Sequence, residues 1–575
     1  MEFKKTYRQW IENDYIDKDT KRELENIKDD EEEIRDRFHQ ELEFGTAGLR
    51  GKIGAGTNRM NKYIISKATQ GLADTIKSRG KQAMDRGVAI AYDTRHFSDF
   101  FAKTAALVLA ANGIKVYLFE DVRPTPELSY AVRRLNTISG IVVTASHNPK
   151  DYNGYKVYWE EGSQILSNIA DEITSNIKNI SDYSKIKTID EEEAQEKGLL
   201  EYIGTEIDNE YIEKVKDLAI REEIDKDIKI VYTPLNGTGN EPVRRVLKER
   251  NFNNIIVVPE QENPDPDFTT VGYPNPEDPK AFKYAQELGK KVDADLLIAT
   301  DPDCDRVSCM VNMDSGEYIA LNGNQIGALL INYVLESRKE QGTLPRNGVI
   351  IKSIVTGDLG KVIAESYGVK TIETLTGFKN ICGKVNEIEK NGEEKFIFGY
   401  EESIGYVYGT FVRDKDAVIS SMLLAEAAAY YKTKDKTLLD VLMDIYDTHG
   451  YYVEDLVNII LEGVEGKNRI SRMMEQYGRD YPIDFDGIKV KKVIDFRTGE
   501  IKDIEDGSIA QDKRNLKTNG LKFILEDGSW YAIRPSGTEP KLKIYIYGKS
   551  DSLPHGRNKL DLIATEVKKR LNSID

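Results

Sequence analysis

The fold expected for this 575-residue chain follows from the stretch Gly140-Ile141-Val142-Val143-Thr144-Ala145-Ser146-His147-Asn148-Pro149. Its first half is a continuous apolar run, which is typical of a strand buried on both faces of a parallel sheet. Its second half turns to small and polar residues, with Ser146 and His147 placed directly after the strand. Because ligands of open α/β sheets bind at the carboxyl ends of the strands, this junction predicts a functional loop.

The same junction recurs twice along the chain. Leu296–Ala299 runs into Thr300-Asp301-Pro302-Asp303-Cys304-Asp305-Arg306, and Phe396–Phe398 runs into Gly399-Tyr400-Glu401-Glu402-Ser403. Strands alternate with helices around each of the three junctions, which indicates βαβ units and largely parallel sheets. The other predicted strands are 88–91, 116–119, 228–232, 255–258 and 349–354, and the predicted helices are 100–111, 126–135, 241–250, 279–290, 325–337 and 359–367.

The two ends of the chain differ from these repeated blocks. Residues 1–44 read as charged helical segments, and the region after about residue 450 combines a helix, mixed strands that include Lys543–Tyr547, and a C-terminal helix. The last region is therefore predicted to be α+β. A chain of this length exceeds one hydrophobic core, which stops growing at about 250–300 residues. We expect several domains, and loops from three of them could face one shared cleft.

Composition excludes some classes of function. The net charge of −17 argues against a nucleic-acid-binding surface, which requires clustered positive charge. There is no apolar run of the ~18 residues that a membrane helix needs, and the N-terminus lacks the apolar stretch of a signal peptide. Three cysteines without zinc spacing fit a reducing compartment. We expect a cytoplasmic protein that binds neither nucleic acid nor membrane.

Asp301, Asp303 and Asp305 form a candidate metal site. Three carboxylates this close repel one another unless a cation neutralises them, and hard oxygen ligands suit Mg²⁺ or Ca²⁺. The loop differs from an EF-hand, which needs glycine at its sixth position, where this chain has Arg306. A guanidinium beside a metal indicates a phosphate nearby. The alternative interpretation of the same residues is a solvated acidic turn.

Ser146 is the candidate nucleophile. Three aspartates leave Mg²⁺ short of its six oxygen ligands, and a phosphate on Ser146 could supply one more. Lys156, in Asn153-Gly154-Tyr155-Lys156, adds a cation downstream of the serine. In isolation, a Ser-His pair after a strand is more often a helix cap or a tight turn.

Five loops besides these carry cations, hydroxyls or carboxylates. Arg534-Pro535-Ser536-Gly537-Thr538-Glu539-Pro540-Lys541 resembles an anion-binding nest, although a β-turn would have similar residues. Lys543 would share a face with Lys541 if a strand starts there. Glu401 and Ser403 suit sugar hydroxyls, although a solvated loop is the simpler interpretation. The remaining loops are Thr376-Gly377-Phe378-Lys379, Arg413-Asp414-Lys415-Asp416 and the Gly-rich segment that ends at Arg50.

Taken together and in this order, the motifs resemble the α-D-phosphohexomutase superfamily over nearly the whole chain. The resemblance implies four domains around a central cleft, three of them similar α/β domains with mixed, largely parallel sheets and the last an α+β domain. With the blocks above, it implies a phosphoserine domain over 1–207, a metal-binding domain over 208–322, a sugar-binding domain over 323–452 and a phosphate-binding domain over 453–575.

The resemblance also implies roles for individual residues. Ser146 would carry phosphate, and its phosphate would bind Mg²⁺ together with Asp301, Asp303 and Asp305. His147 and Lys415 would transfer or position protons, with Arg50 and Lys156 near the transferring phosphate. Glucose 1,6-bisphosphate would be both activator and intermediate of a phosphoglucomutase reaction. The implied substrate-binding residues are Arg306, Thr376, Gly377, Lys379, Glu401, Ser403, Arg534, Ser536, Gly537 and Thr538.

The motifs depart from the family pattern at two positions, and both changes are small in volume. Ala47 stands where many relatives have serine, and Cys304 stands where glycine or alanine is frequent. The sequence Tyr400-Glu401-Glu402-Ser403 is closer to glucose- and pentose-phosphate mutases than to mannose enzymes.

Alternatives with the same fold are a phosphopentomutase or a glucose-1,6-bisphosphate synthase, and a remote one is a non-catalytic sugar-phosphate-binding protein. The neighbouring Arg413 could lower the pKa of Lys415, whereas Asp414 and Asp416 would raise it. The oligomeric state cannot be predicted from these motifs.

Overall fold

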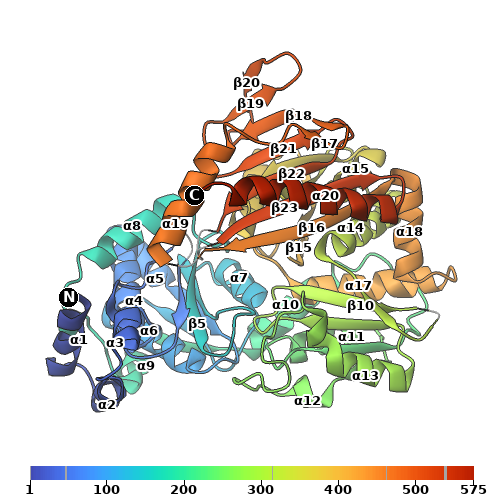
Figure 1. The fold of residues 1–575 in the computed structure, drawn as a ribbon. Helices are drawn as coiled ribbons and strands as arrows, with labels where there is room; N and C mark the ends of the chain where they lie inside the picture. Colours follow the sequence, from blue (N-terminus) through green and yellow to red (C-terminus); the bar gives the residue numbers. More distant parts are fainter. Residues whose placement is uncertain (1, 46–47, 314, 462, 537–540) are drawn as a thin grey trace.

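The computed structural model describes residues 2–45, 48–313, 315–461, 463–536 and 541–575. The N-terminal charged segments form three short helices, α1 (Glu2–Glu12), α2 (Lys18–Asn26) and α3 (Glu31–Phe38), as the sequence predicts. Their apolar side chains, among them Trp10 and Phe38, pack around the ring of Tyr63 at one end of the molecule (Figure 1).

The first α/β unit is built on a six-stranded sheet with the order β1-β5-β4-β2-β3-β6. Strand β4 (Ser139–Val143) carries the apolar run, with Val142 in one hydrophobic core and Ile141 and Val143 in another. Both faces of the strand are therefore buried, which explains its lack of alternation. The unit also contains β1 (Gly48–Lys52), β2 (Val88–Tyr92), β3 (Val116–Phe119), β5 (Tyr152–Trp159), β6 (Leu200–Ile203), α4 (Lys62–Ser78), α5 (Lys81–Arg86), α6 (Ser98–Ala111), α7 (Thr125–Arg134), α8 (Ser167–Lys178), a 3₁₀ turn (Tyr183–Lys185), α9 (Glu191–Glu196) and α10 (Thr205–Lys216).

The second α/β unit has the strand order β11-β10-β9-β7-β8. Strand β9 (Leu296–Thr300) pairs parallel with β7 (Ile230–Thr233), as expected. The helix predicted over 279–290 is confirmed as α13 (Lys283–Val292) but is wrong at its start, where a 3₁₀ turn at Pro279–Phe282 precedes it. The other elements are α11 (Asn240–Glu249), β8 (Ile255–Val257), α12 (Pro259–Glu262), β10 (Val307–Asn312) and β11 (Tyr318–Ala320).

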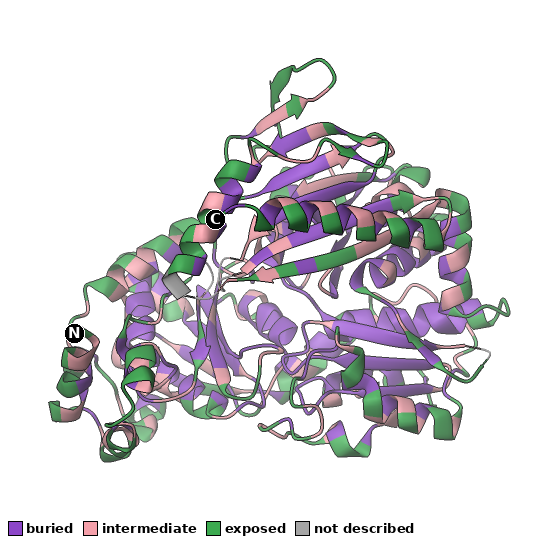
Figure 2. Ribbon diagram, viewed as in Figure 1, coloured by how far each residue is buried: buried purple, intermediate pink, exposed green. Residues whose placement is uncertain are grey.

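The third α/β unit has the strand order β13-β12-β14-β15. Strand β14 (Lys395–Glu401) extends further than predicted, so Glu401 ends the strand and does not lie in the loop. The long helix α17 (Ala417–Lys432) is almost wholly buried in the large core that all three α/β units share (Figure 2). The other elements are α14 (Gly323–Glu340), β12 (Gly348–Ser353), α15 (Leu359–Ser366), β13 (Lys370–Thr374), α16 (Phe378–Asn391), β15 (Gly405–Tyr408) and α18 (Leu438–His449).

One arrangement is common to the three α/β units. The strands that carry the predicted loops, β4, β9 and β14, each turn back into an antiparallel partner, β5, β10 and β15 respectively. Each loop that carries candidate functional residues is therefore the turn of a hairpin, at the edge of the sheet where the parallel strands end. A hairpin fixes both ends of its loop in one sheet, which holds the functional side chains in place.

The fourth unit is a twisted antiparallel sheet, drawn orange to red in Figure 1, with the order β16-β23-β22-β21-β18-β19-β20 and β17 paired to β18. Strand β23 (Lys541–Ser550) starts at Lys541, so Lys541 and Lys543 lie on one face as predicted. The predicted fold class, three α/β domains and a C-terminal α+β domain, is confirmed. The other elements are β16 (Tyr451–Ile460), α19 (Gly463–Tyr477), β17 (Asp484–Phe485), β18 (Ile488–Asp495), β19 (Glu500–Asp503), β20 (Ile509–Gln511), β21 (Leu521–Leu525), β22 (Trp530–Pro535) and α20 (Leu553–Asn572).

Buried polar contacts hold the fourth unit against the third. The Lys522 ammonium lies 3.8 Å from the centre of the Trp530 ring and donates a hydrogen bond to the Ile354 carbonyl at 2.9 Å. The Trp530 indole donates to Asp358 at 2.7 Å. These contacts fix strand β22, and with it Arg534 at its end, relative to the third unit. No described helix is both long enough and apolar enough to span a bilayer.

Candidate active site

Ser146 lies where the first and second units meet. Its Oγ donates a hydrogen bond to Asp301 Oδ2 at 2.7 Å and lies 3.1 Å from His147 Nδ1. The residue is 3% exposed and has a positive φ of 53°, a conformation that a non-glycine residue rarely adopts. The surrounding loop thus holds the Ser146 backbone in a strained conformation, in which the hydroxyl points toward the acidic loop of the second unit.

Arg95 supports the serine loop from behind, and the sequence analysis missed it. Its guanidinium donates to the carbonyls of Ser146, Asn148 and Pro149, and it forms a fully buried ion pair with Asp93 at 3.3 Å. Both residues follow β2, which is parallel to β4, so they emerge at the same sheet edge as Ser146. The sequence Asp93-Thr94-Arg95 at a strand end is the signal that could have identified them.

The three predicted metal ligands lie together. Oxygens of Asp301, Asp303 and Asp305 fall within 4.8 Å of one another, and all three residues are buried. Within the described chain, Asp303 Oδ1 and Asp305 Oδ1 have no hydrogen-bond partner, whereas Asp301 Oδ1 accepts from the backbone N–H groups of Asp305 and Arg306. Buried carboxylate oxygens without donors fit a hard divalent cation such as Mg²⁺.

Electrostatics in the triad follow from this crowding. Burial, together with the charges of Asp303 and Asp305, raises the pKa of Asp301 well above its usual range. Burial also opposes ionisation of Asp303, but the ammonium groups of Lys156 and Lys415 outweigh it and lower the pKa of Asp303. Without a cation, the crowding of the triad therefore opposes ionisation of Asp301.

Two lysines from different units contact the triad. Lys156 Nζ lies 2.7 Å from Asp303 Oδ2 and 3.6 Å from an oxygen of Asp305, and Lys415 Nζ lies 2.8 Å from Asp305 Oδ2. Lys156 comes from β5 of the first unit, and Lys415 from the loop before α17. The structure thus brings the predicted serine, aspartates and lysines into one site.

A lowered pKa of Lys415, which the sequence left open, is wrong. Burial lowers the pKa, but the carboxylates of Asp305 and Asp414 outweigh burial and raise it. Arg413 has no such influence because its guanidinium turns away from the site, to Asn386 at 2.6 Å and to Glu389. Lys415 is a cation in this site.

Arg306 links the triad to the predicted sugar loop. Its Nη1 donates to the Ser403 carbonyl at 2.8 Å, and the backbones of Arg306 and Gly405 form an isolated β-bridge. Glu401 accepts a hydrogen bond from the Gly377 N–H at 2.6 Å, and burial together with Glu402 raises the pKa of Glu401 to about 7. The sugar loop and the loop before α16 therefore share one side of the site.

Thr376 and Lys379, the other predicted site residues of the Gly377 loop, are only partly buried. The Thr376 carbonyl accepts from Asn380 at 2.8 Å, and burial lowers the pKa of Lys379. Gly377 has a φ of 103°, which only glycine adopts without strain.

The predicted phosphate loop is described in part. Arg534 is the second-last residue of β22 and pairs in register with Lys543 on β23. The Ser536 N–H donates to the Lys541 carbonyl at 2.8 Å. Gly537 and Thr538 lie outside the described residues. Burial, together with the negative charge of Glu402, raises the pKa of Tyr545, and the charge of Arg534 opposes this rise. This part of the fourth unit therefore lies close to the sugar loop of the third.

Arg50 and His147 complete the set of predicted residues. Arg50 lies on β1 and donates to Asn148 Oδ1 at 3.1 Å, so it contacts the serine loop as Arg95 does. Burial and the nearby guanidinium groups of Arg306 and Arg50 lower the pKa of His147 well below its usual range. The imidazole is therefore neutral at physiological pH.

A second feature that the sequence analysis missed is the segment 273–279 of the second unit. The Tyr273 ring meets the His147 ring edge to face, with centroids 6.1 Å apart. Prolines at 274, 276 and 279 stiffen the segment, and their spacing is the signal that could have drawn attention to it.

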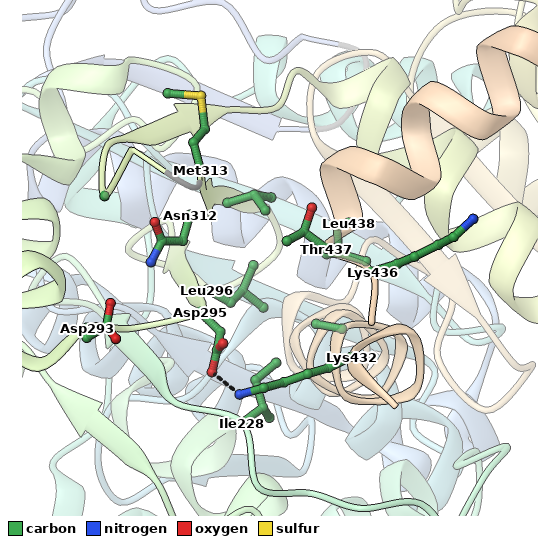
Figure 3. A pocket seen from close by; sticks show the side chains of 13 residues that line it. Ile228, Asp293, Asp295, Leu296, Asn312, Met313, Lys432, Lys436, Thr437 and Leu438 are labelled. Carbon is green, nitrogen blue, oxygen red and sulfur yellow. Dashed lines mark hydrogen bonds and ion pairs between the residues drawn. The ribbon is translucent and has the colours of Figure 1, made fainter. Parts of the chain in front are cut away.

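Two surface cavities lie away from the triad. One of about 310 Å³ lies between β9, β10 and the start of α18, where Lys432 pairs with Asp295 at 2.8 Å (Figure 3). Another of about 640 Å³ contains Lys379 and Arg514, between the third and fourth units. Neither is lined by Ser146 or by the aspartate triad.

Asp416 gives a prediction about stability. Its carboxylate caps α17 by accepting from the Ile419 N–H at 2.8 Å, and burial raises the pKa to about 7 from an ordinary 3.8. A carboxyl whose pKa is higher in the folded than in the unfolded state lowers the free energy of unfolding as the pH rises from about 4 to 7. Asp416→Asn keeps the cap and removes this cost, so its unfolding free energy should exceed that of the parent by up to ~4 kcal/mol above pH ~7. Near pH ~4 the two should be equal.

Denaturant unfolding of both proteins at acidic and alkaline pH measures this difference. Asp416→Ala is the control, because it removes the charge and the cap together and should lose about 1 kcal/mol relative to Asp416→Asn. A gap between parent and Asp416→Asn that does not change with pH would contradict the assignment.

The chain was then compared with known proteins. Four models of one family match in order: Phosphoglucomutase/phosphomannomutase alpha/beta/alpha domain I over residues 41–184, domain II over 209–314, domain III over 322–449, and the C-terminal domain over 491–555. A phosphoglucomutase of Staphylococcus epidermidis is 39% identical over 537 residues, which cover 93% of this chain and 95% of the relative. A phosphoglucomutase of Staphylococcus aureus is 40% identical over 514 residues, covering 89% of this chain and 91% of the relative.

Solved structures share the fold at lower identity. The open form of the Paramecium phosphoglucomutase parafusin aligns with a TM-score of 0.66 at 19% identity, covering 92% of this chain and 95% of that one. A phosphoglucomutase/phosphomannomutase family protein of Burkholderia thailandensis aligns with a TM-score of 0.64 at 19% identity, covering 92% and 97%.

Proposed function

Because the chain belongs to the phosphoglucomutase/phosphomannomutase family, we propose that it interconverts glucose 1-phosphate and glucose 6-phosphate through phospho-Ser146 and a glucose 1,6-bisphosphate intermediate. Its place in the α-D-phosphohexomutase superfamily, closest to phosphoglucomutase, confirms the sequence-based prediction. Relatives that carry the name phosphoglucomutase match nearly end to end, which supports this activity. The observation that carries the mechanism is the Ser146 Oγ, 2.7 Å from a triad carboxylate.

The first transfer breaks the bond between Ser146 Oγ and phosphorus. A free hydroxyl of the sugar phosphate attacks the phosphorus and the new O–P bond forms. The hydroxyl proton is passed on, so that the Ser146 oxygen leaves as a hydroxyl. The bisphosphate then turns round, and its other phosphoryl group returns to Ser146 Oγ. Such a reaction depends mostly on positioning and on neutralising charge.

Proton transfers at Ser146 are assigned to His147 and Lys415. The neutral imidazole lies 3.1 Å from Ser146 Oγ and would orient the hydroxyl or accept its proton. Lys415, whose pKa is raised, would act as a cation that gives a proton to the leaving oxygen. Arg50, Lys156 and Arg306 would neutralise the transferring phosphoryl group.

We assign Mg²⁺ to Asp301, Asp303 and Asp305, with an oxygen of the Ser146 phosphate as a further ligand. The ion would polarise the phosphoryl group as a Lewis acid. Glucose 1,6-bisphosphate is the proposed activator, because it can phosphorylate Ser146 in an enzyme that has lost its phosphate.

The rest of the substrate is assigned to the third and fourth units. Arg534 and Ser536, with Gly537 and Thr538, would hold the phosphate that is not reacting, and Glu401 and Ser403 would hold sugar hydroxyls. Thr376, Gly377 and Lys379 would line the same side. We further propose domain limits near residues 207, 322 and 452. The cytoplasm is the proposed location, supported by three buried cysteines that form no disulfide within the described chain.

Substrate preference can be tested directly. Glucose 1-phosphate should be converted to glucose 6-phosphate with a kcat/KM at least ~10-fold above that for ribose 1-phosphate, since a carboxylate placed for a hexose hydroxyl is left unpaired by a pentose. A coupled assay with and without the bisphosphate activator measures both values. Faster turnover of ribose 1-phosphate would support a phosphopentomutase. Net formation of bisphosphate from a phosphoryl donor would instead support the synthase alternative.

A further inference from the structure

The carboxylate of Glu277 projects from a rigid segment of the second unit. Within the segment 273–279, Pro274, Asn275 and Pro276 are buried, and Asn275 Oδ1 accepts the Glu277 N–H at 3.0 Å. This Asx turn and the prolines fix the backbone. Glu277 itself is accessible to solvent, but its carboxyl lies among neighbouring groups, and burial there raises its pKa.

Charged groups of three units surround this carboxylate. Arg306 of the triad loop, Glu402 of the sugar loop and Lys543 of β23 all act on Glu277 electrostatically. After Asp305, Glu277 is the acid whose charge contributes most to raising the pKa of Arg306. At the near end of the segment, Tyr273 packs on His147. The segment therefore runs from the serine loop to the point where the other motif loops converge.

The Glu277 carboxylate has acceptor capacity left for a ligand. Glu401 already accepts from the Gly377 N–H at 2.6 Å, and Glu402 accepts from the Thr356 hydroxyl at 2.8 Å. By contrast, the Glu277 carboxylate forms no ion pair in the described chain, and the Asn275 side chain is the group that hydrogen-bonds to it. Glu277 can therefore receive a ligand donor in addition to Glu401.

The charges on either side select the ligand group. Under the function proposed above, Arg306 serves the phosphoryl group at Ser146, and Lys543 adjoins the clamp for the distal phosphate. A carboxylate between them repels phosphate but accepts a hydrogen bond from a hydroxyl. The part of the substrate that spans two phosphate sites is the sugar. We infer that Glu277 binds a ring hydroxyl of the sugar phosphate, as a specificity-determining residue; this inference rests on the proposed function.

Kinetics with deoxy substrates test this inference. Glu277→Ala should lower kcat/KM for glucose 1-phosphate by about 10- to 100-fold, the loss expected for one hydrogen bond to a charged group. For the 2-, 3- or 4-deoxy analogue that lacks the bonded hydroxyl, parent and variant should have the same kcat/KM. Glu277→Gln should recover part of the loss, because its amide oxygen still accepts.

Glu287→Ala on α13 is the matched control, since Glu287 is exposed on the same unit and makes no recorded pair with the described residues. It should leave every kcat/KM unchanged. An equal loss by Glu277→Ala on all four substrates, or no loss on any, would overturn the inference. If the parent protein turned over no glucose 1-phosphate, the proposed function would fail instead. Calorimetric titration of parent and variant with glucose 1,6-bisphosphate would then decide the role of Glu277: equal affinities would overturn it.

Discussion

Replacing Ser146 with alanine should abolish mutase turnover. We expect kcat to fall by roughly 10⁴-fold or more, as when the nucleophile of a covalent mechanism is removed. The Ser146 hydroxyl is the group placed 2.7 Å from Asp301 and 3.1 Å from His147, so alanine removes the proposed acceptor of the phosphoryl group. A coupled assay of glucose 6-phosphate formation, with saturating activator, measures the loss.

Backbone strain supplies a control for this experiment. Ser146 has a φ of 53°, which costs about 1–2 kcal/mol for a residue with a Cβ and nothing for glycine. Ser146→Gly should therefore be at least as stable as Ser146→Ala while being equally inactive. Both should still bind glucose 1,6-bisphosphate, since the remaining site is intact. Appreciable turnover by either variant would show that phosphate does not pass through Ser146.

Replacing Asp301 with asparagine should separate catalysis from folding. Without a cation, the raised pKa of Asp301 favours its protonated form, which asparagine imitates. The asparagine oxygen can still accept from the N–H groups of Asp305 and Arg306. We therefore expect metal-free variant and parent to have similar melting temperatures. Turnover should fall by about 10²-fold or more, because a charged metal ligand is lost.

Added Mg²⁺ distinguishes this account from simple misfolding. At 100 times its Kd, Mg²⁺ should stabilise the parent by about 2.7 kcal/mol, and it should stabilise Asp301→Asn much less. Thermal melts of both proteins, with EDTA and with increasing Mg²⁺, measure the two shifts. Equal shifts would mean that the cation binds elsewhere. Turnover in EDTA by the parent would contradict a metal role for the triad.

The three α/β units could be predicted because their central strands are continuous apolar runs that end in polar loops. Val142 and its neighbours are buried on both faces, a pattern that local sequence reveals. The returning strands were not predicted. In β5, for example, buried and half-buried residues follow one another in an order that is neither an alternation nor a continuous apolar run. Helix 279–290 was wrong at its start, where Pro279 and Asp278 favour a 3₁₀ turn.

Prediction of the site succeeded for residues within motifs and failed for their tertiary neighbours. Arg95 and Glu277 sit in loops whose chemistry emerges only when strand ends are brought together. The pKa of Lys415 depends on Asp305, which is distant in sequence, more than on the adjacent Arg413. The anion nest at Gly537 and Thr538 stays a prediction, because these residues lie outside the described chain.

The most direct test of the central claim is to follow a labelled phosphoryl group. The protein is incubated with Mg²⁺ and glucose 1,6-bisphosphate carrying radioactive phosphate, then digested, and the peptides are mapped by mass spectrometry. The account predicts one phosphoryl group on Ser146, which disappears from the protein and reappears in sugar bisphosphate when unlabelled glucose 6-phosphate is added. Label on another residue, or label on Ser146 that does not transfer to the sugar, would contradict it.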